Sequence, residues 1–232
     1  MKRINHSVRF ILLSFAAVLL LSGCGSSNKL ADYDYSGRTL AAVYEFPPYP
    51  EVLTGAYFPG HPKRPIHAVI RLGSRIAKEI EANDLREKLA EASDSVDVAS
   101  LLSDRLLTRS ARYLGADPVG DERDADFLLE VRVRDYGIDA EDWDAAAHFF
   151  VDAEVVLLER RTGHEIWRNR VKERDNITPA VFGPIPVRNV VTAHAFSQLS
   201  VEEIGAALEG LSEYAADSIA DHLRDGLRKA RK

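Results

Sequence analysis

Residues that often perform catalysis occur in this chain, but not in the patterns that catalysis requires. The 232 residues contain no Gly-x-Ser-x-Gly elbow, no glycine-rich phosphate-binding loop, and no Ser-x-x-Lys motif with its companion motifs. Paired carboxylates that hydrolyse glycosides come together only in a folded chain, and nothing in the sequence singles out a pair. We therefore predict that the chain is not an enzyme.

Histidines and clustered carboxylates are candidates for metal binding. No two histidines have the i, i+4 spacing that places two zinc ligands on one helix face. His61 and His67 flank a proline-rich segment and could meet a metal, although surface or turn positions explain them more simply. Four carboxylates crowd one segment, at Asp139, Glu141, Asp142 and Asp144. They offer the oxygen ligands that calcium prefers, but the segment lacks the central glycine of an EF-hand, so a solvated loop is favoured. We predict no metal and no cofactor.

Cys24 is the residue with the clearest chemistry. It is the only cysteine, which excludes an intramolecular disulfide and a cysteine-based zinc site. Leu21-Ser22-Gly23-Cys24 resembles the lipobox of bacterial lipoproteins, in which the signal peptide is cut before the cysteine and the cysteine is acylated. An ordinary secretory signal with a stray cysteine is the alternative, but a free exposed thiol is unusual in an exported chain. The resemblance implies that Cys24 is the lipidation site and carries fatty acyl chains such as palmitate.

Residues 1–23 have the features of a signal peptide. Lys2, Arg3 and Arg9 are positive. The uncharged run Phe10–Leu21 spans about 18 Å as a helix, well short of the ~30 Å of bilayer hydrocarbon. Removing residues 1–23 removes these three positive charges and no negative one, which takes the net charge from −6 to −9. A chain this acidic is a poor nucleic-acid binder, and no other stretch is long enough to predict a membrane span.

We expect the mature chain to be held at a membrane by its N-terminal acyl chains. Two or three chains, at about 0.8 kcal/mol per buried methylene, anchor a protein stably where a single myristoyl chain does not. An aspartate after the cysteine tends to retain lipoproteins in the inner membrane, and this chain has Gly25 there. The expected location is therefore the outer membrane, with the domain facing the periplasm.

The first part of the mature chain is predicted to be a tether, a strand and an insertion. Residues 24–37 are small and polar, which is typical of a flexible tether. Residues 39–46 favour a strand, and several prolines make residues 49–65 an apolar loop. Apolar residues then recur at helical spacing from Ile66 to Leu89. The loop and this helix form an insertion around residues 47–92.

The middle of the chain is predicted to be a helix followed by strands. Ser95 or Asp97 can cap a helix that Gly115 ends. The apolar face of this helix is expected to contain Val98, Leu101, Leu102, Leu106 and Tyr113. Alternating apolar residues predict strands over residues 127–136, 149–159 and 164–171. Because Arg161-Thr162-Gly163 separates the last two runs, they are expected to form a β-hairpin.

The last part of the chain contains the clearest helix. Residues 174–199 have three prolines and are predicted to be a loop. Ser200-Val201-Glu202-Glu203 fits a capping box, and leucines and isoleucines recur at helical spacing almost to the end of the chain. We therefore predict a single α/β (α+β) domain over residues 38–232. It has a mixed or largely antiparallel sheet of about four strands, covered by helices that include a long amphipathic one at the C-terminus.

Two surface features are candidates for partner or lipid contact. The two apolar loops contain the partner-contact candidates Tyr57, Phe58, Phe182 and Ile185, although these loops can instead fold back over the sheet. The C-terminal tail is basic, with Arg224, Arg228, Lys229, Arg231 and Lys232 against Asp225. It suits contact with anionic headgroups or an acidic partner. We favour the simpler interpretation that its cations complement the negative end of the helix dipole.

The order of these elements resembles one family. The strand Asp126–Val133, the hairpin Ala153–Trp167 and the helix Ser200–Arg228, together with the lipobox, look like the ABC-type transport auxiliary lipoproteins. That resemblance implies a non-catalytic accessory protein of a system that carries phospholipid between membranes with hexameric MCE-domain partners, and it leaves a homo-oligomer possible. Related α/β domains occur in curli-secretion-type lipoproteins and in activators of peptidoglycan synthases.

Those relatives supply the alternative functions. One is an outer-membrane secretion or structural lipoprotein, for which residues 174–199 are the only segment suited to enter a membrane or to contact a partner. Another is an activator of a cell-wall enzyme. A lipid-anchored hydrolase is the third, and it would need a polar pocket with perturbed carboxylates.

Overall fold

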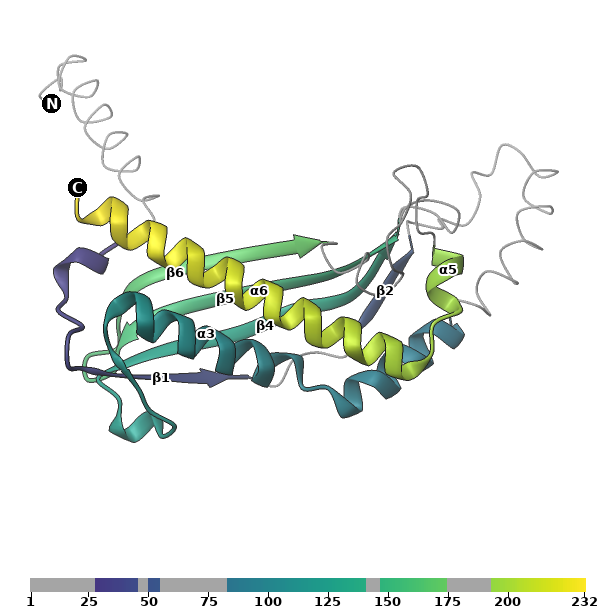
Figure 1. The fold of residues 1–232 in the computed structure, drawn as a ribbon, viewed down its shortest axis with the longest axis horizontal. Helices are drawn as coiled ribbons and strands as arrows, with labels where there is room; N and C mark the ends of the chain where they lie inside the picture. The colour runs from purple at the N-terminus through teal and green to yellow at the C-terminus, as the bar shows by residue number, and fades with distance from the viewer. Residues whose placement is uncertain (1–27, 46–49, 55–82, 141–146, 175–192) are drawn as a thin grey trace, which may run out of the picture.

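The described part of the chain forms one sheet, with two long helices lying across one of its faces (Figure 1). The computed structural model describes residues 28–45, 50–54, 83–140, 147–174 and 193–232. The six strands are β1 (Thr39–Tyr44), β2 (Glu51–Thr54), β3 (Asp117–Pro118), β4 (Phe127–Ala140), β5 (Ala147–Glu159) and β6 (His164–Arg174). Their order is β3-β1-β4-β5-β6, and β2 pairs with the later part of β4.

The sheet is mixed, as predicted, but it has six strands in these residues where about four were expected. β4, β5 and β6 are antiparallel neighbours, while β1 runs parallel to both β3 and β4. The two additional strands are short. β2 lies inside the segment predicted as a loop, and that prediction is wrong for residues 51–54. β4 continues to Ala140, beyond its predicted end, and offers Gly137–Ala140 as a parallel partner for β2.

The predicted hairpin is confirmed between β5 and β6. Gly163 has a φ of 69°, in the left-handed region that favours glycine, and its N–H donates to the Glu159 carbonyl at 2.8 Å. The register then shifts, since Leu157 faces Trp167 while Leu158 faces Glu165. This irregularity leaves Ile166 as an extra residue, and Ile166 and Trp167 are both buried.

The helix predicted after residue 95 is confirmed as α3 (Val98–Leu114). The Asp97 side chain accepts a hydrogen bond from the Ser100 N–H at 2.9 Å, and Gly115 ends the helix with a left-handed φ of 76°. Leu102 and Leu106 lie in the core as expected, whereas Leu101 is 38% exposed. The apolar stripe of α3 is therefore narrower than the sequence indicated.

The long C-terminal helix is confirmed as α6 (Val201–Ala230). Ser200 and Glu203 form both hydrogen bonds of the predicted capping box. The helix crosses the sheet diagonally beside α3 (Figure 1). One of its stripes is buried against β5, β6 and α3, and it contains Ile204, Leu208, Leu211, Ala215, Ile219, Leu223 and Leu227.

Ion pairs join α3 to α6 at the edge of their apolar contact. The Arg105 guanidinium donates to both carboxylate oxygens of Asp217, at 2.7 and 2.9 Å, and Arg109 contacts the same carboxylate at 2.9 Å. The Tyr113 hydroxyl donates to Asp221 at 3.0 Å. These bidentate and shared contacts fix the register of one helix along the other.

Residues 28–37 belong to the folded domain, in contrast to the flexible tether predicted over residues 24–37. Leu30 begins a 3-10 helix (Leu30–Asp32) and is fully buried. The Asn28 side chain donates to the Gly226 carbonyl of α6 at 2.9 Å. A Cβ at position 226 would lie 3.2 Å from both Leu30 Cδ1 and Trp167 Nε1, so the absence of a side chain there permits this close approach. We call the contact of Asn28 and Leu30 with Gly226 and Trp167 the N-terminal clip.

Two helical segments occur where the sequence indicated an insertion and a loop. Residues 83–95 are helical, and Leu85 and Leu89 are buried in agreement with the predicted stripe. The loop predicted over residues 174–199 is wrong at its end, where α5 (Ala193–Ser197) forms. Phe196 in α5 is fully buried and packs on Phe149 with ring centroids 4.9 Å apart. That tertiary contact was not visible in the sequence.

We predict that Gly226→Val lowers the free energy of unfolding by about 1–3 kcal/mol, because the new side chain collides with Leu30 and Trp167. Urea unfolding measures the loss. Ala206→Val, at an exposed position of the same helix, is the control and should cost only a few tenths of a kcal/mol. A Gly226→Val protein as stable as the native one would contradict the close packing of the clip.

We also predict that Tyr35→Phe leaves stability unchanged or raises it. Tyr35 is 1% exposed, and its hydroxyl has no hydrogen-bond partner in the described structure, so its removal ends a desolvation cost of about 1–3 kcal/mol. Tyr113→Phe is the control, since that half-buried hydroxyl donates to Asp221 at 3.0 Å and its loss should be destabilising. Thermal unfolding measures the stability of both variants. A Tyr35→Phe protein less stable than the native one would mean that the Tyr35 hydroxyl makes a hydrogen bond.

Candidate functional site

The sheet face opposite α3 and α6 carries a continuous pattern of charged side chains. β4, β5 and β6 each place every second residue on this face, and the residue that follows β1 contributes as well. We call it the charged face. It consists of Glu45, Glu130, Arg132, Arg134, Asp152, Glu154, Glu165, Arg168 and Arg170.

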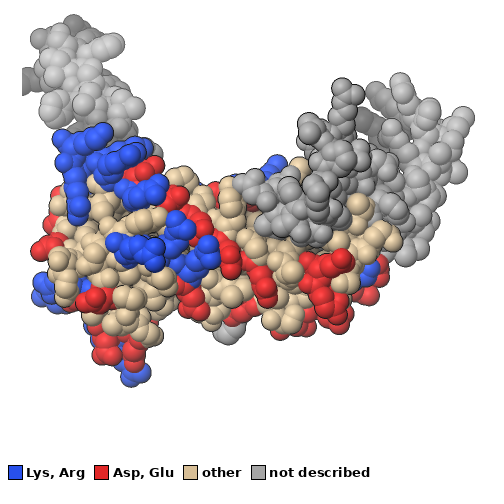
Figure 2. Space-filling model, in the orientation of Figure 1, with Lys and Arg blue, Asp and Glu red and all other residues tan. Residues whose placement is uncertain are grey.

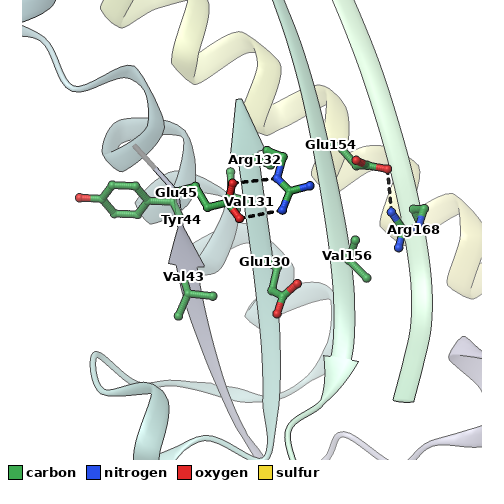
Figure 3. Close-up of a pocket in the computed structure, with 9 residues that line it drawn as sticks. All are labelled: Val43, Tyr44, Glu45, Glu130, Val131, Arg132, Glu154, Val156 and Arg168. Atoms are coloured by element: carbon green, nitrogen blue, oxygen red, sulfur yellow. Dashed lines mark hydrogen bonds and ion pairs between the residues drawn. The ribbon is translucent and has the colours of Figure 1, made fainter. Parts of the chain in front are cut away.

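Ion pairs cross this face from strand to strand. Glu154 on β5 lies at the centre, where it accepts from Arg134 Nε of β4 at 3.1 Å and from Arg168 Nη1 of β6 at 2.7 Å. Arg168 also contacts Glu165 at 2.6 Å. Figure 3 shows the bond between Glu154 and Arg168 beside the bidentate pair of Arg132 with Glu45. The result is a chain of alternating charges across three strands.

The strand register produces these pairs. Glu154 lies opposite Arg132 on β4 and opposite Arg170 on β6, so this central acid is flanked by basic residues on both sides. Arg170 binds the neighbouring acid, Asp152, with both carboxylate oxygens engaged at 2.7 and 2.6 Å. Opposite charges in adjacent strands stabilise the pairing, and the alternation fixes it to one register.

The central carboxylates are largely buried and remain ionised. Asp152 is 6% and Glu154 9% exposed. Hydrogen bonds from Arg134 and Arg168 hold the pKa of Glu154 below its usual value, even though burial acts in the opposite direction. The hydrogen bonds from Arg170 likewise lower the pKa of Asp152. A carboxyl that acts as a general acid needs a raised pKa, so this arrangement suits a fixed charged surface better than acid catalysis.

A shallow hollow opens on the charged face between β1, β4 and β5 (Figure 3). Its volume is about 280 Å³. Val43 and Val156 provide apolar surface, while Tyr44, Glu130 and the ion pairs of Glu45 and Glu154 line the rest. Ligand pockets usually hold ~300–1,000 Å³, so the hollow lies at the small end of that range and is large enough for a side chain of a partner.

The sequence-predicted site residues fall mostly outside the described residues. Those outside are Cys24, Tyr57, Phe58, Phe182 and Ile185, together with His61, His67, Glu141, Asp142 and Asp144. Asp139 is described, and it forms an ion pair with Arg174 at 2.7 Å. Within the described ranges, no group of three or more histidine, cysteine, aspartate or glutamate side chains is placed to hold a metal.

The charged face was not identified from the sequence, although a signal for it exists. Arg132 and Arg134 occupy alternate positions of β4, and Arg168 and Arg170 do so in β6. On its own, this alternation indicates only the solvent side of half-buried strands. The acids at alternate positions of β5 are the feature that distinguishes a paired surface from a simple solvated one.

Comparison with known proteins finds only distant structural likenesses. No protein-family model matches the sequence, and no curated protein matches it either. Protein XCC0632 from Xanthomonas campestris, of family-model DUF330, has a TM-score of 0.39 at 12% identity, over 86% of this chain and 90% of that chain.

Two further structures show weaker likeness. The PelC dodecamer from Paraburkholderia phytofirmans has a TM-score of 0.30 at 8% identity, over 78% of this chain and 86% of that chain. The lipoprotein GNA1162 from Neisseria meningitidis has a TM-score of 0.26 at 12% identity, over 60% of this chain and 83% of that chain. All three TM-scores lie below 0.5, so we argue function from the residues of this chain.

We predict that the charged face makes stability depend on acid pH. Because the pKa values of Asp152 and Glu154 are lowered on folding, their contribution is present above the unfolded values near 4 and is lost as pH falls through the folded values. Glu154→Gln should lower the unfolding free energy at pH 7 by about 1–2 kcal/mol, allowing for the solvent exposure of both arginines.

Urea unfolding between pH 3 and 7 measures this dependence. The difference between the native protein and Glu154→Gln should shrink as pH falls below about 4, because the carboxyl of the unfolded chain then binds a proton more readily than the folded one. Glu209→Gln, at an exposed position of α6, serves as the control and should show neither effect. A pH-independent difference would mean that Glu154 acts through packing and not through its charge.

Proposed function

We propose that the chain is a lipid-anchored, non-catalytic binding component of the bacterial envelope. It would sit at the outer membrane, face the periplasm, and serve as an accessory protein of a system that moves phospholipid between membranes. Its partner would be an MCE-type protein or a permease subunit of that system.

The observation that carries this proposal is the placement of the lipobox relative to the fold. A basic segment, an apolar run and Leu21-Ser22-Gly23-Cys24 occur in the order that export and acylation require. Cys24 then lies four residues before Asn28, where the N-terminal clip begins. An acylated Cys24 would therefore hold the domain close to the membrane, within reach of other envelope components.

The charged face supports a binding role rather than a catalytic one. Asp152 and Glu154, the buried carboxylates of this face, have lowered pKa values and are bound by arginines, so neither is poised to donate a proton. The hollow beside Val43 and Val156 gives an apolar centre with a charged rim, which is the composition that protein interfaces favour. Glu130 lies at this rim and is exposed, which makes it a suitable position for a partner contact.

We predict that the partner is captured only by the lipidated chain. In a crosslinking pull-down from membranes, the native protein should recover an MCE-type or permease subunit, and Cys24→Ala should not, because it lacks acylation and cannot reach the correct membrane. Glu130→Arg, with Cys24 intact, should reduce recovery several-fold by reversing one charge at the rim. Glu209→Arg makes the same charge change on the exposed side of α6 and should retain recovery.

Other outcomes would reject parts of the proposal. Recovery of peptidoglycan synthases alone would favour the activator role, and recovery of further copies alone would favour a homo-oligomer. Equal recovery with Glu130→Arg and Glu209→Arg would exclude the hollow from the interface. An unmodified Cys24 in the mass of the purified native protein would exclude the lipid anchor itself.

A further inference from the structure

One end of the molecule is basic although the chain as a whole is acidic. Exposed Lys and Arg side chains gather where α6 ends (Figure 2). We call this the basic end, and it consists of Lys29, Arg228, Lys229, Arg231 and Lys232. Within the described part of the chain, only Arg228 of these five has an ion pair, with Asp225 at 3.5 Å. The basic end therefore differs from the charged face, where the arginines are held by carboxylates.

The N-terminal clip places the start of the domain at this same end. Asn28 bonds the Gly226 carbonyl in the last turns of α6, and the Lys29 N–H donates to the Ile166 carbonyl at 2.9 Å. The four residues from Cys24 to Asn28 can span at most about 14 Å when fully extended. An acyl anchor on Cys24 thus keeps the basic end within reach of the lipid surface.

The opposite end of the molecule carries the opposite charge. Exposed acids gather there, at Asp84, Glu87, Glu91, Asp94, Asp97, Glu202, Glu203 and Glu209. The helix over residues 83–95 and the start of α6 meet at this end, where Lys88 donates to the Ser197 carbonyl at 2.9 Å. Figure 2 shows the acidic side chains over this region, far from the basic end.

The distance between the two ends decides which of them responds to a charged membrane. The 30 residues of α6 span about 45 Å. At physiological ionic strength the field of a charged surface decays over a Debye length of about 8 Å. Attraction therefore acts on the basic end alone once the anchor has placed it at the surface. When the domain tilts, the acidic end approaches the same surface and is repelled.

We propose that the basic end is a binding site for the phosphate-bearing headgroups of anionic phospholipids, and that this contact holds α6 upright on the membrane. The inference rests on the proposed lipid anchor and goes beyond it by assigning an orientation. Lysine and arginine at a helix end bind headgroup phosphates by direct charge contact. The charged face then projects from the membrane, where a periplasmic partner can contact it.

The test uses the full acylated chain reconstituted in phosphatidylcholine vesicles, with or without phosphatidylglycerol, that contain a quencher attached to headgroups. Acylation blocks the Cys24 thiol, so an introduced cysteine is the only free thiol in the chain. One fluorophore is attached through Lys232→Cys at the basic end and another, in a separate sample, through Glu91→Cys at the acidic end. Phosphatidylglycerol should increase quenching at position 232 several-fold relative to position 91, and high salt should remove this increase.

Charge variants separate the headgroup contact from simple proximity to the anchor. Reversal by Arg228→Glu, Lys229→Glu and Arg231→Glu should abolish the effect of phosphatidylglycerol. The conservative set Arg228→Lys, Lys229→Arg and Arg231→Lys should retain it. Thermal unfolding verifies that each variant folds. If the reversed variant does not fold, the salt dependence of quenching in the labelled chain without charge reversal still tests the headgroup contact.

Three results would overturn the orientation, namely equal quenching at both positions, quenching independent of phosphatidylglycerol and salt, or a reversed variant that behaves as the native chain does. The intact mass of the protein separates these failures from failure of the anchor. A chain without acyl groups that does not sediment with vesicles rejects the proposed lipid anchor, whereas an acylated chain with equal quenching rejects only the orientation.

Discussion

Burial of one stripe of α6 is the constraint on which the rest of the structure depends. The stripe runs from Ile204 to Leu227 and packs on β5, β6 and α3 at once. Each of its large apolar side chains contributes about 1.5–3 kcal/mol when it leaves water. Since α6 touches both the last hairpin and α3, its position sets the distance between them, and the ion pairs of Asp217 with Arg105 and Arg109 then fix the register of the two helices.

The same constraint determines what the two sheet faces can carry. The face under α3 and α6 must be apolar, and Leu129, Val131, Val155 and Leu157 fill it. Because strand side chains alternate, the residues between them project to the other face, where charged residues are placed. Those charges lie close together on adjacent strands, and the arginines can neutralise Glu154 and Asp152 only because the register puts opposite signs side by side.

Most of the fold could be predicted from local signals, and its long-range contacts could not. The capping box at Ser200 and the turn at Gly163 depend on a few neighbouring residues, so they are visible in the sequence. β2 forms only because β4 extends far enough to pair with it, and α5 is held by the contact of Phe196 with Phe149. Leu30 lies in a mostly polar segment, and its burial depends on the close approach that Gly226 permits. The charged face required the register across three strands, including the irregularity at Ile166, which no local pattern specifies.

Net charge is a poor guide to how this molecule meets its surroundings, because pairing decides which charges act at a distance. On the charged face each buried carboxylate lies against an arginine, so the field outside is small and the surface offers shape and short-range hydrogen bonds. At the basic end the cations outnumber their described partners, so attraction extends over a Debye length. An acidic chain can therefore hold its basic end against anionic lipid while a nearly neutral face remains available to a protein. The N-terminal clip couples these two properties, because it joins the start of the domain to the end of α6 that carries cations left unpaired in the described part of the chain.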